Sequence, residues 1–311
     1  MKVLIDGMNI VFIEYNIARK KLHDEGKELN EENIGMFYHM IVNKFNSIFS
    51  TYSHPIICWE GKNSSAYRKN LFPGYKENRK QQRNEEEYKI LKNTFSTIRQ
   101  ILNYYPCKQI ELEETEGDDI IFALCEKFKE EDRVVVLSSD GDFAQLGNHF
   151  DNVMVYDPIR RREIEKKENI AIQKAIVGDS SDGIPGLHRV GIKTFEKMMK
   201  NEEEWNKILQ KENNQKLFET FLSIIDLSKF PKERHEKIRS LEENIEYNNF
   251  SPDEIEAFFW DNKLKDLLNR WSQVKNSIYS CISQEQLTEK NQNDRIESDD
   301  EMIDRMLGGL V

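Results

Sequence analysis

Short apolar runs alternate with helix-periodic segments through the first half of the chain. Four runs have the β-rich or continuous apolar character of buried strands, and each is soon followed by an acidic residue: 2–5, 55–59, 133–137 and 153–156. Between them, apolar positions at helical spacing predict helices over 33–49, 86–102 and 118–128. Apolar strands that alternate with helices predict an α/β fold with a mostly parallel central sheet covered on both faces.

The second half of the chain has a different pattern. Strand signals stop at about residue 168, and the segment that follows is helical and rich in Lys, Glu and Asn. Ser251 to Glu254 has the sequence of a capping box that opens a helix. We therefore predict an α/β domain over 1–167, a helical domain over 168–283 and a flexible acidic tail over 284–311. The apolar end of that tail, 302–311, is either a frayed terminus or a peptide that docks on a partner.

Acidic residues gather where the predicted strands end. The set consists of Asp6, Glu60, Glu116, Asp118, Asp119, Asp140, Asp142, Asp179 and Asp182. Helix capping explains one acid per turn, and a set of unrelated caps is the alternative interpretation. Because the carboxyl ends of parallel strands share one edge, we expect the acids to converge there. Such a cluster needs cations, and oxygen ligands suit Mg²⁺ or Mn²⁺, which in pairs promote phosphodiester hydrolysis.

Charge is strongly segregated along the chain, so the formal net charge of −11 does not exclude a nucleic-acid partner. Residues 62–83 carry seven bases and one acid, whereas residues 291–311 carry six acids and two bases. In a helix, Lys76, Arg79, Lys80 and Arg83 would share one face. A solvated helix face is the simpler explanation of such a run. Its position directly after the strand that ends at Glu60 favours phosphate recognition.

Several function classes are disfavoured by the sequence. The turn at 178–194 has nearly the spacing of a P-loop, but Ile192 interrupts the required Gly-Lys pair, so ATP binding is not expected. A helix–turn–helix hairpin there would offer backbone amides and Lys193 to a DNA phosphate. Four scattered cysteines indicate free thiols in a reducing cytosol. No apolar run reaches about 18 residues, so we expect no membrane association.

Six motifs stand in the order that is typical of one nuclease family. They are Leu4-Ile5-Asp6-Gly7, Trp59-Glu60-Gly61-Lys62, Tyr75-Lys76-x-x-Arg79, Glu116-Gly117-Asp118-Asp119, Ser139-Asp140-Gly141-Asp142 and Gly178-Asp179-x-x-Asp182-x-Ile184-Pro185-Gly186. Together they resemble the 5′-nuclease (flap endonuclease) family, of the stand-alone phage ribonuclease H and 5′-3′ exonuclease type. The resemblance extends from residue 1 to about 199.

The resemblance implies a fold and a chemistry. The sheet would be PIN-like or Rossmann-like, with a helical arch at about 62–100 and a helix–three-turn–helix at 178–199. The activity would be two-metal hydrolysis at 5′ ends and 5′ flaps of branched DNA or RNA–DNA, which removes RNA primers during lagging-strand replication. The nine acids would hold two Mg²⁺ ions, for which Mn²⁺ can substitute, and K⁺ would bind near the hairpin. Lys76 and Arg79 would act on the scissile phosphate, and the nucleic acid would be bound by Arg68, Lys80, Arg83, Arg189 and Lys193.

Two departures from the family pattern concern the site itself. Glu60 stands where the family usually has Asp, and Arg189 stands where the hairpin usually has its first Gly. On family analogy we expect a monomer in the cytoplasm, of a bacterial host if phage-encoded, whose tail binds a sliding clamp or a single-strand-binding protein. The alternatives are a PIN-like ribonuclease and a non-catalytic branched-DNA-binding scaffold.

Overall fold

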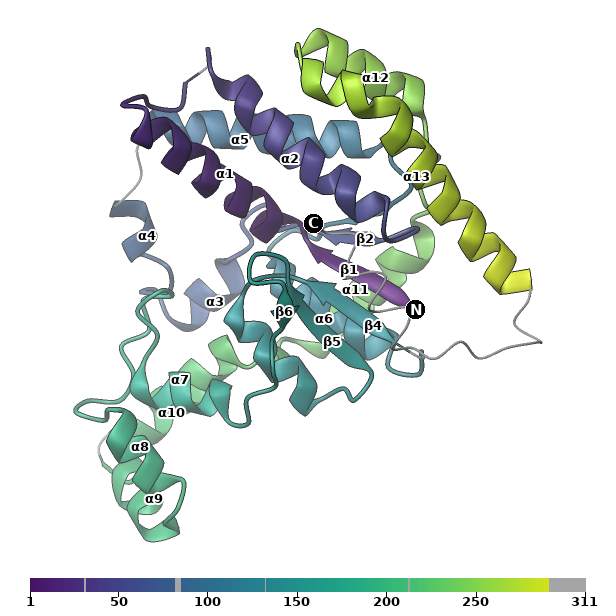
Figure 1. Ribbon diagram of the computed structural model, residues 1–311. Helices are drawn as coiled ribbons and strands as arrows, with labels where there is room; N and C mark the ends of the chain where they lie inside the picture. The colour runs from purple at the N-terminus through teal and green to yellow at the C-terminus, as the bar shows by residue number, and fades with distance from the viewer. Residues whose placement is uncertain (31, 82–84, 132, 212, 291–311) are drawn as a thin grey trace. The chain divides into compact units, whose positions relative to one another are not determined.

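A six-stranded sheet organises the protein, and its strands lie in the order β3-β2-β1-β4-β5-β6 (Figure 1). The computed structural model describes residues 1–30, 32–81, 85–131, 133–211 and 213–290. The strands are β1 (Lys2–Asp6), β2 (Ile56–Cys58), β3 (Lys108–Ile110), β4 (Val134–Leu137), β5 (Val153–Asp157) and β6 (Arg162–Glu163). β4 and β5 are parallel with Leu137 opposite Tyr156, and β6 returns antiparallel to β5. The predicted α/β fold around a mostly parallel sheet is confirmed.

Helices make up most of the remaining described chain. They are α1 (Gly7–Asp24), α2 (Ile34–Phe49), α3 (Ala66–Leu71), α4 (Asn78–Gln81), α5 (Glu85–Leu102), α6 (Gly117–Lys127), the 3₁₀ helix η1 (Gly141–Asn148), α7 (Ile170–Val177), α8 (Ile192–Met198), α9 (Glu202–Leu209), α10 (Asn214–Ile225), the 3₁₀ helix η2 (Leu227–Lys229), α11 (Lys232–Asn244), α12 (Pro252–Asp261) and α13 (Lys265–Lys290). The predictions for α2, α5 and α6 are confirmed to within one residue at each end. The short polar strands β3 and β6 carry too little apolar pattern to be predicted.

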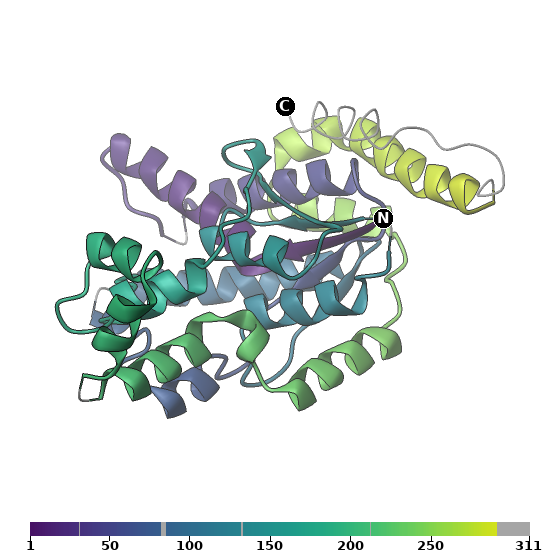
Figure 2. The same cartoon turned by 90° about the horizontal axis from the view of Figure 1, so that it is seen from below.

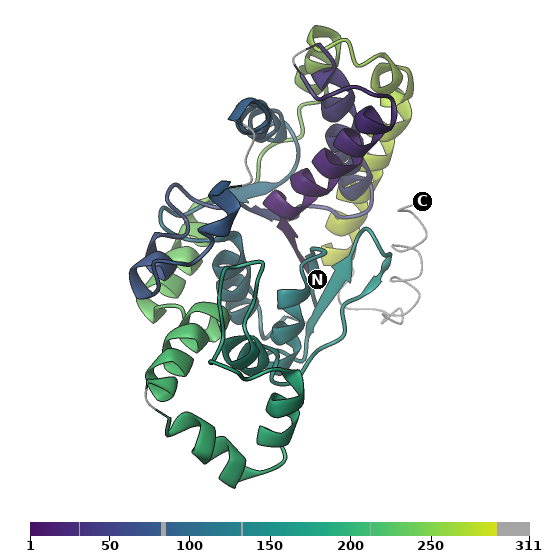
Figure 3. The same ribbon diagram turned by 90° about the vertical axis from the view of Figure 1, so that its left-hand side faces the viewer.

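Residue contacts divide the chain into two compact units. The first comprises residues 1–2, 58–83 and 110–244. In it, α10 packs on α7 and α11 packs on α6, both visible in Figure 2, and α7 leads into the α8–α9 pair in Figure 3. Its helical part has an apolar core that includes Ile176, Ile184 and Phe221. This unit contains all of the predicted site residues except Asp6, which lies in the other unit.

The second unit comprises residues 3–57, 84–109 and the chain from 245 onward. In it, α2 packs on α1, α5 and α13, and α12 packs on α13 (Figure 1). Both units combine segments that are far apart in the sequence. The predicted domain limits at 167 and 283 do not coincide with the boundaries of these units, and they remain a prediction.

Three local predictions are corrected by the structure. A single helical face through residues 76–83 is wrong, because α4 begins only at Asn78 and Lys76 precedes it with φ of +53°. The side chain of Ser251 makes no capping hydrogen bond to α12. α13 extends to Lys290, well into the predicted tail, and residues 291–311 lie outside the described residues. Among the described helices, none is both long and apolar enough to cross a membrane.

Candidate active site

Three carboxylates meet at a turn that follows α7. Asp142, Asp179 and Asp182 each offer one oxygen, and these oxygens all lie within 4.8 Å of one another. Asp142 reaches this point from the first turn of η1, which follows β4. The other two lie in a turn closed by reciprocal backbone hydrogen bonds of 2.8 Å between Asp179 and Ile184. Gly178 starts that turn at φ of +101°, where a Cβ atom would lie 2.8 Å from the carbonyl oxygen of Ile184.

A lysine that sequence reasoning missed holds two of these acids together. The Nζ of Lys174, on α7, forms an ion pair with Asp142 and lies 2.7 Å from Oδ2 of Asp179. Burial alone would lower the pKa of Lys174, but the charges of Asp142 and Asp179 raise it above its ordinary value. Burial raises the pKa of Asp142, and the charge of Asp140 raises it further against the effect of Lys174. The signal in the sequence is one lysine in the otherwise mostly apolar segment Ile170–Val177.

A second acidic group centres on Glu116, which caps the N-terminus of α6 and is 2% exposed. Its Oε2 accepts hydrogen bonds of 2.9 Å from the Tyr75 hydroxyl and from Nζ of Lys76. Burial would raise the pKa of Glu116, but the charges of Lys76 and Arg68 outweigh burial and lower it. Glu116 is therefore held as a carboxylate at neutral pH. Tyr75 is a further member of this group that the sequence analysis did not name as a site residue.

Glu60 belongs electrostatically to the same group. Burial raises its pKa, Glu116 adds to that effect, and Lys76 opposes it. The Ser64 hydroxyl donates a hydrogen bond of 3.2 Å to Oε2 of Glu60. Asp118 lies beside Glu116 in the first turn of α6 and is half-buried.

The two predicted phosphate-acting bases lie directly against these acids. Lys76 contacts Glu116 through Nζ, and its backbone N–H donates to the carbonyl of Asp182 at 2.8 Å. The guanidinium of Arg79 lies 2.7 Å from Oδ1 of Asp182. The backbones at Gly74 and Gly183 approach closely, and a Cβ atom on Gly183 would lie 2.8 Å from the carbonyl oxygen of Gly74. Two basic and two acidic candidates are thus brought together from segments about 40 to 100 residues apart.

Arg68 and Asp119 have a different place from the one predicted. The Arg68 guanidinium donates two hydrogen bonds of 2.7 Å to the two carboxylate oxygens of Asp119, and its Nε donates to the carbonyl of Ile224 at 2.8 Å. Arg68 is 3% exposed and Asp119 is 0% exposed. This enclosed position contradicts the prediction that Arg68 binds nucleic acid. Both carboxylate oxygens of Asp119 accept from Arg68, and Oδ2 also accepts from the backbone N–H of Glu116, so the pair fixes the start of α6. The role of Asp119 as a metal ligand stays a prediction.

The remaining candidates come from other positions in the chain. Asp6 ends β1 in the second unit, and its Oδ1 accepts a hydrogen bond of 3.0 Å from the N–H of Asn9. Asp140 caps η1 by accepting from the N–H of Asp142 at 2.9 Å. Arg189 and Lys193 are exposed in the segment 178–199, which contains α8 and is called the α8 hairpin. Arg189 has φ of +59°. The backbone of Lys80 lies in α4, whereas Arg83 lies outside the described residues.

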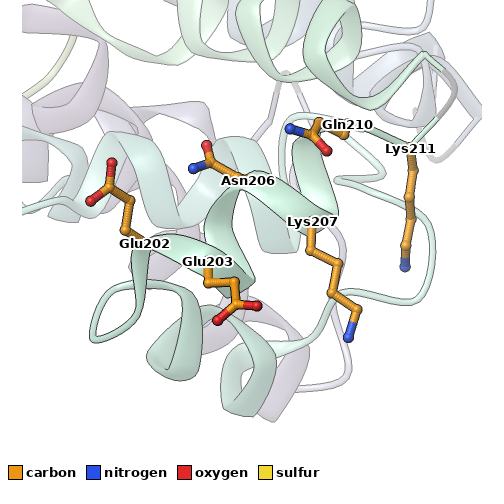
Figure 4. Close-up of a pocket in the computed structure, with 6 residues that line it drawn as sticks. All are labelled: Glu202, Glu203, Asn206, Lys207, Gln210 and Lys211. Carbon is orange, nitrogen blue, oxygen red and sulfur yellow. The ribbon is translucent and has the colours of Figure 1, made fainter.

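A separate hollow of about 670 Å³ lies along α9. It is lined by Glu202, Glu203, Asn206, Lys207, Gln210 and Lys211, and Figure 4 shows that these side chains do not converge on a common point. The six residues come from one helix and the turn after it, so they form a solvated helix face. The acid groups described above are the better candidate for chemistry.

Comparison with known proteins agrees with the arrangement of these residues along the chain. Residues 1–177 match the family model described as 5'-3' exonuclease, N-terminal resolvase-like domain. DNA polymerase I of Bacillus subtilis (strain 168) is 26% identical over 289 residues, which are 86% of this chain and 32% of that protein. Ribonuclease H of Enterobacteria phage T4 is 27% identical over 168 residues, which are 50% of this chain and 55% of that protein. The chain thus spans between a third and just over half of the length of these relatives.

A solved structure has a similar fold. The T5 5'-exonuclease with bound divalent zinc ions superposes with a TM-score of 0.54 at 20% identity, covering 77% of this chain and 97% of that one. At this identity the superposition shows a similar fold only. The family is shown by the family model, which covers more than half of the sequence. By its sequence and by the order of its acidic motifs, the chain belongs to the 5'-3' exonuclease family.

Proposed function

We propose that this protein is a metal-dependent, structure-specific 5′-nuclease. It would hydrolyse phosphodiesters at 5′ ends and 5′ flaps of branched DNA or RNA–DNA, and so remove RNA primers during lagging-strand replication. One observation carries this proposal: three carboxylates within 4.8 Å of one another, at Asp142, Asp179 and Asp182, have the bases of Lys76 and Arg79 beside them. Acids alone suit many cation sites, but acids with adjacent phosphate-binding groups suit phosphodiester chemistry.

The residues present fit divalent ions. We call the group of Asp142, Asp179 and Asp182 the acid turn. All of its ligand atoms are carboxylate oxygens, which hard cations such as Mg²⁺ and Mn²⁺ prefer. Burial and neighbouring Asp140 raise the pKa of Asp142, so the cluster gains from added positive charge. Asp142, Asp179 and Asp182 would hold one ion, and Glu116 and Asp118 with Glu60 and Asp140 would supply ligands of another. The resemblance to the family assigns a metal-binding role to Asp6 as well. Bound divalent ions supply the charge that activates water and stabilises the leaving oxygen at neutral pH.

The chain's own bases orient the substrate in this proposal. Lys76 and Arg79 contact Glu116 and Asp182 in the absence of DNA, so both cations already face the acids. A scissile phosphate that enters there can take over these cations and be fixed between them. Tyr75 holds Glu116 from the other side through its hydroxyl, which keeps the carboxylate in one orientation. The relative T5 5'-exonuclease is described with divalent ions, which is consistent with a site of this kind.

Further parts of the proposal concern binding partners. The exposed residues Arg189 and Lys193, at the α8 hairpin, would hold duplex DNA by its phosphates, with K⁺ as an additional ligand of that hairpin. Lys80 and Arg83 would also bind the nucleic acid. The chain beyond residue 290 would bind a sliding clamp or a single-strand-binding protein. We further propose that the protein acts as a monomer in the cytoplasm, of a bacterial host if it is phage-encoded.

A labelled flap substrate tests the nuclease proposal. A 5′-labelled flap duplex is incubated with the full chain while Mg²⁺ is titrated in, with EDTA as the negative control. The expected result is metal-dependent release of a short 5′ fragment whose length distinguishes flap cutting from exonucleolytic cutting. Asp142→Asn should lower the cleavage rate by at least about 100-fold. Asp261→Asn, an exposed acid at the end of α12, is the matched control and should cleave normally.

Binding measured in parallel separates the competing functions. Asp142→Asn should still bind the flap duplex in EDTA, because it removes an ion ligand and leaves the basic groups in place. Tight binding by the wild-type chain without cleavage in Mg²⁺ or Mn²⁺ would instead favour the non-catalytic scaffold. Preferential cleavage of unbranched single-stranded RNA would favour the PIN-like ribonuclease. Unchanged cleavage by Asp142→Asn would refute the assignment of the acid turn.

A further inference from the structure

The ammonium of Lys174 contacts two of the three acids of the acid turn. It is paired with Asp142 and lies 2.7 Å from Oδ2 of Asp179, and both acids belong to the three-carboxylate group. The lysine side chain is 24% exposed, and that of Asp179 is 9% exposed. The contact is therefore partly shielded from solvent, where ion pairs are screened less than at an open surface.

An ammonium and a divalent ion cannot both lie against the same carboxylate oxygens. Mg²⁺ binds carboxylate oxygens at about 2.0–2.1 Å and demands nearly octahedral geometry. With the Lys174 ammonium against one oxygen of Asp142 and one of Asp179, the ion would meet a like charge at the distance of its own ligands. Binding of the ion thus requires Nζ to leave at least one of the two acids.

Basic residues balance the negative charge of the acid turn. Asp142, Asp179 and Asp182 approach within 4.8 Å, and like charges at that distance repel. Arg79 neutralises Asp182 from one side, and Lys174 neutralises the other two. The basic residues beside the cluster therefore compensate its negative charge.

We propose that Lys174 is a resident counter-cation of the acid turn, which a divalent ion must displace in order to bind Asp142, Asp179 and Asp182. The inference deepens the proposed function and rests on it for the presence of an ion at this place. Its consequence is that the acid turn binds its ion more weakly than its carboxylates alone would. Lys174 then sets the concentration of Mg²⁺ or Mn²⁺ at which the protein becomes fully loaded.

Titration calorimetry with Mn²⁺ alone tests this role without any substrate. The full wild-type chain and the variants Lys174→Met, Lys174→Arg and Asp142→Asn are titrated, and the site lost in Asp142→Asn identifies the acid turn. Lys174→Met should bind Mn²⁺ there about tenfold more tightly, within the range by which groups around metal ligands change affinity. Lys174→Arg keeps the charge and should bind like the wild type. Lys207→Met removes an exposed lysine that pairs with Glu204 and is the matched control.

Thermal melting gives a second readout that is valid even if the methionine variant is unstable. Metal-free Lys174→Met should melt below the wild type, because Asp142 and Asp179 lose their counter-cation. Saturating Mn²⁺ should remove that difference, because the ion replaces the lost charge. A difference that persists at saturating Mn²⁺ would show a packing role and overturn the inference.

The outcomes separate this inference from the proposed function. Unchanged or weaker Mn²⁺ binding by Lys174→Met, with normal binding by the wild type, overturns only the role of Lys174. Tighter binding by Lys174→Arg as well would overturn it too, because charge would then not be the cause. A wild-type chain that binds no Mn²⁺ would overturn the metal-dependent function together with this inference.

Discussion

Removal of the Arg68 guanidinium should destabilise the protein strongly. The guanidinium makes two hydrogen bonds of 2.7 Å to Asp119, a third of 2.8 Å to the carbonyl of Ile224, and an ion pair of 3.4 Å with Glu116. In Arg68→Met the methionine keeps the apolar part of the side chain, but the Asp119 carboxylate, which is 0% exposed, is left without its partner. The carboxylate can neither reach water nor move away, because it also holds the backbone N–H of Glu116.

The size of the loss follows from the burial of both partners. Removing one member of a buried ion pair costs about 3–5 kcal/mol, since the other charge stays buried and unpaired. Domains are stable by only about 5–15 kcal/mol in total, so the expected loss is a large fraction of the stability. With a urea dependence of about 2 kcal/mol per M, the unfolding midpoint should fall by about 2 M.

Urea unfolding monitored by circular dichroism, in EDTA, measures this effect. The double variant Arg68→Met/Asp119→Leu should recover most of the loss, because the buried unpaired charge is gone. Lys207→Met, which breaks an exposed ion pair of 3.6 Å, should cost less than about 1 kcal/mol. A loss below about 1 kcal/mol for Arg68→Met would refute the argument, since it would mean that Arg68 and Asp119 are solvated in the folded protein.

Three further predictions concern the site and the fold. Lys76→Ala should lower the cleavage rate by about 100-fold without weakening Mn²⁺ binding, and an equal loss of both would contradict its action on phosphate. Arg189→Gly should change the stability by less than about 1 kcal/mol, because φ of +59° suits glycine. If Arg189 contacts a phosphate, the slope of log Kd against log salt should also fall by about 0.9, and an unchanged slope would exclude the contact. Burial lowers the pKa of His235 below its ordinary value of 6.5 against the effect of Glu126, so the unfolded chain takes up the proton first. Stability should therefore fall as the pH drops below about 6.5, and His235→Gln should flatten that part of a urea-midpoint curve between pH 7.5 and 5.0.

Local patterns in the sequence were sufficient to predict the strands β1, β2, β4 and β5 and the helices α2, α5 and α6. Asp140 and Asp142 could be placed because a nearly all-valine strand, β4, stops just before them. The same reasoning placed Glu116 and Asp118 at the start of α6, where carboxylates favour a helix N-terminus. The fold class followed from the alternation of these strands and helices, and it is confirmed. These predictions depended only on residues near one another in the chain.

Local patterns could not distinguish the roles of bases that look alike. Arg68, Lys76 and Arg79 lie in one basic segment, and the sequence analysis assigned all three to the nucleic acid. Their surroundings come from elsewhere: Asp119 lies 51 residues from Arg68, Glu116 lies 40 from Lys76, and Asp182 lies 103 from Arg79. Only Arg68 meets an acid that is wholly enclosed, so it is used inside the fold, whereas Arg79 stays at the surface.

Local patterns also missed Lys174, a base that does contact the acids of the site. A lysine in an apolar helix normally extends its charge into water and has no particular role. Here the helix ends at a glycine turn that brings Asp179 back to it, and Asp142 arrives from η1, so the ammonium lies between two acids. The charge of the acid turn is therefore balanced in part by a lysine that no motif includes. Since an ion must compete with such residues, the metal affinity of this site depends on its basic neighbours as much as on the acids that define the family.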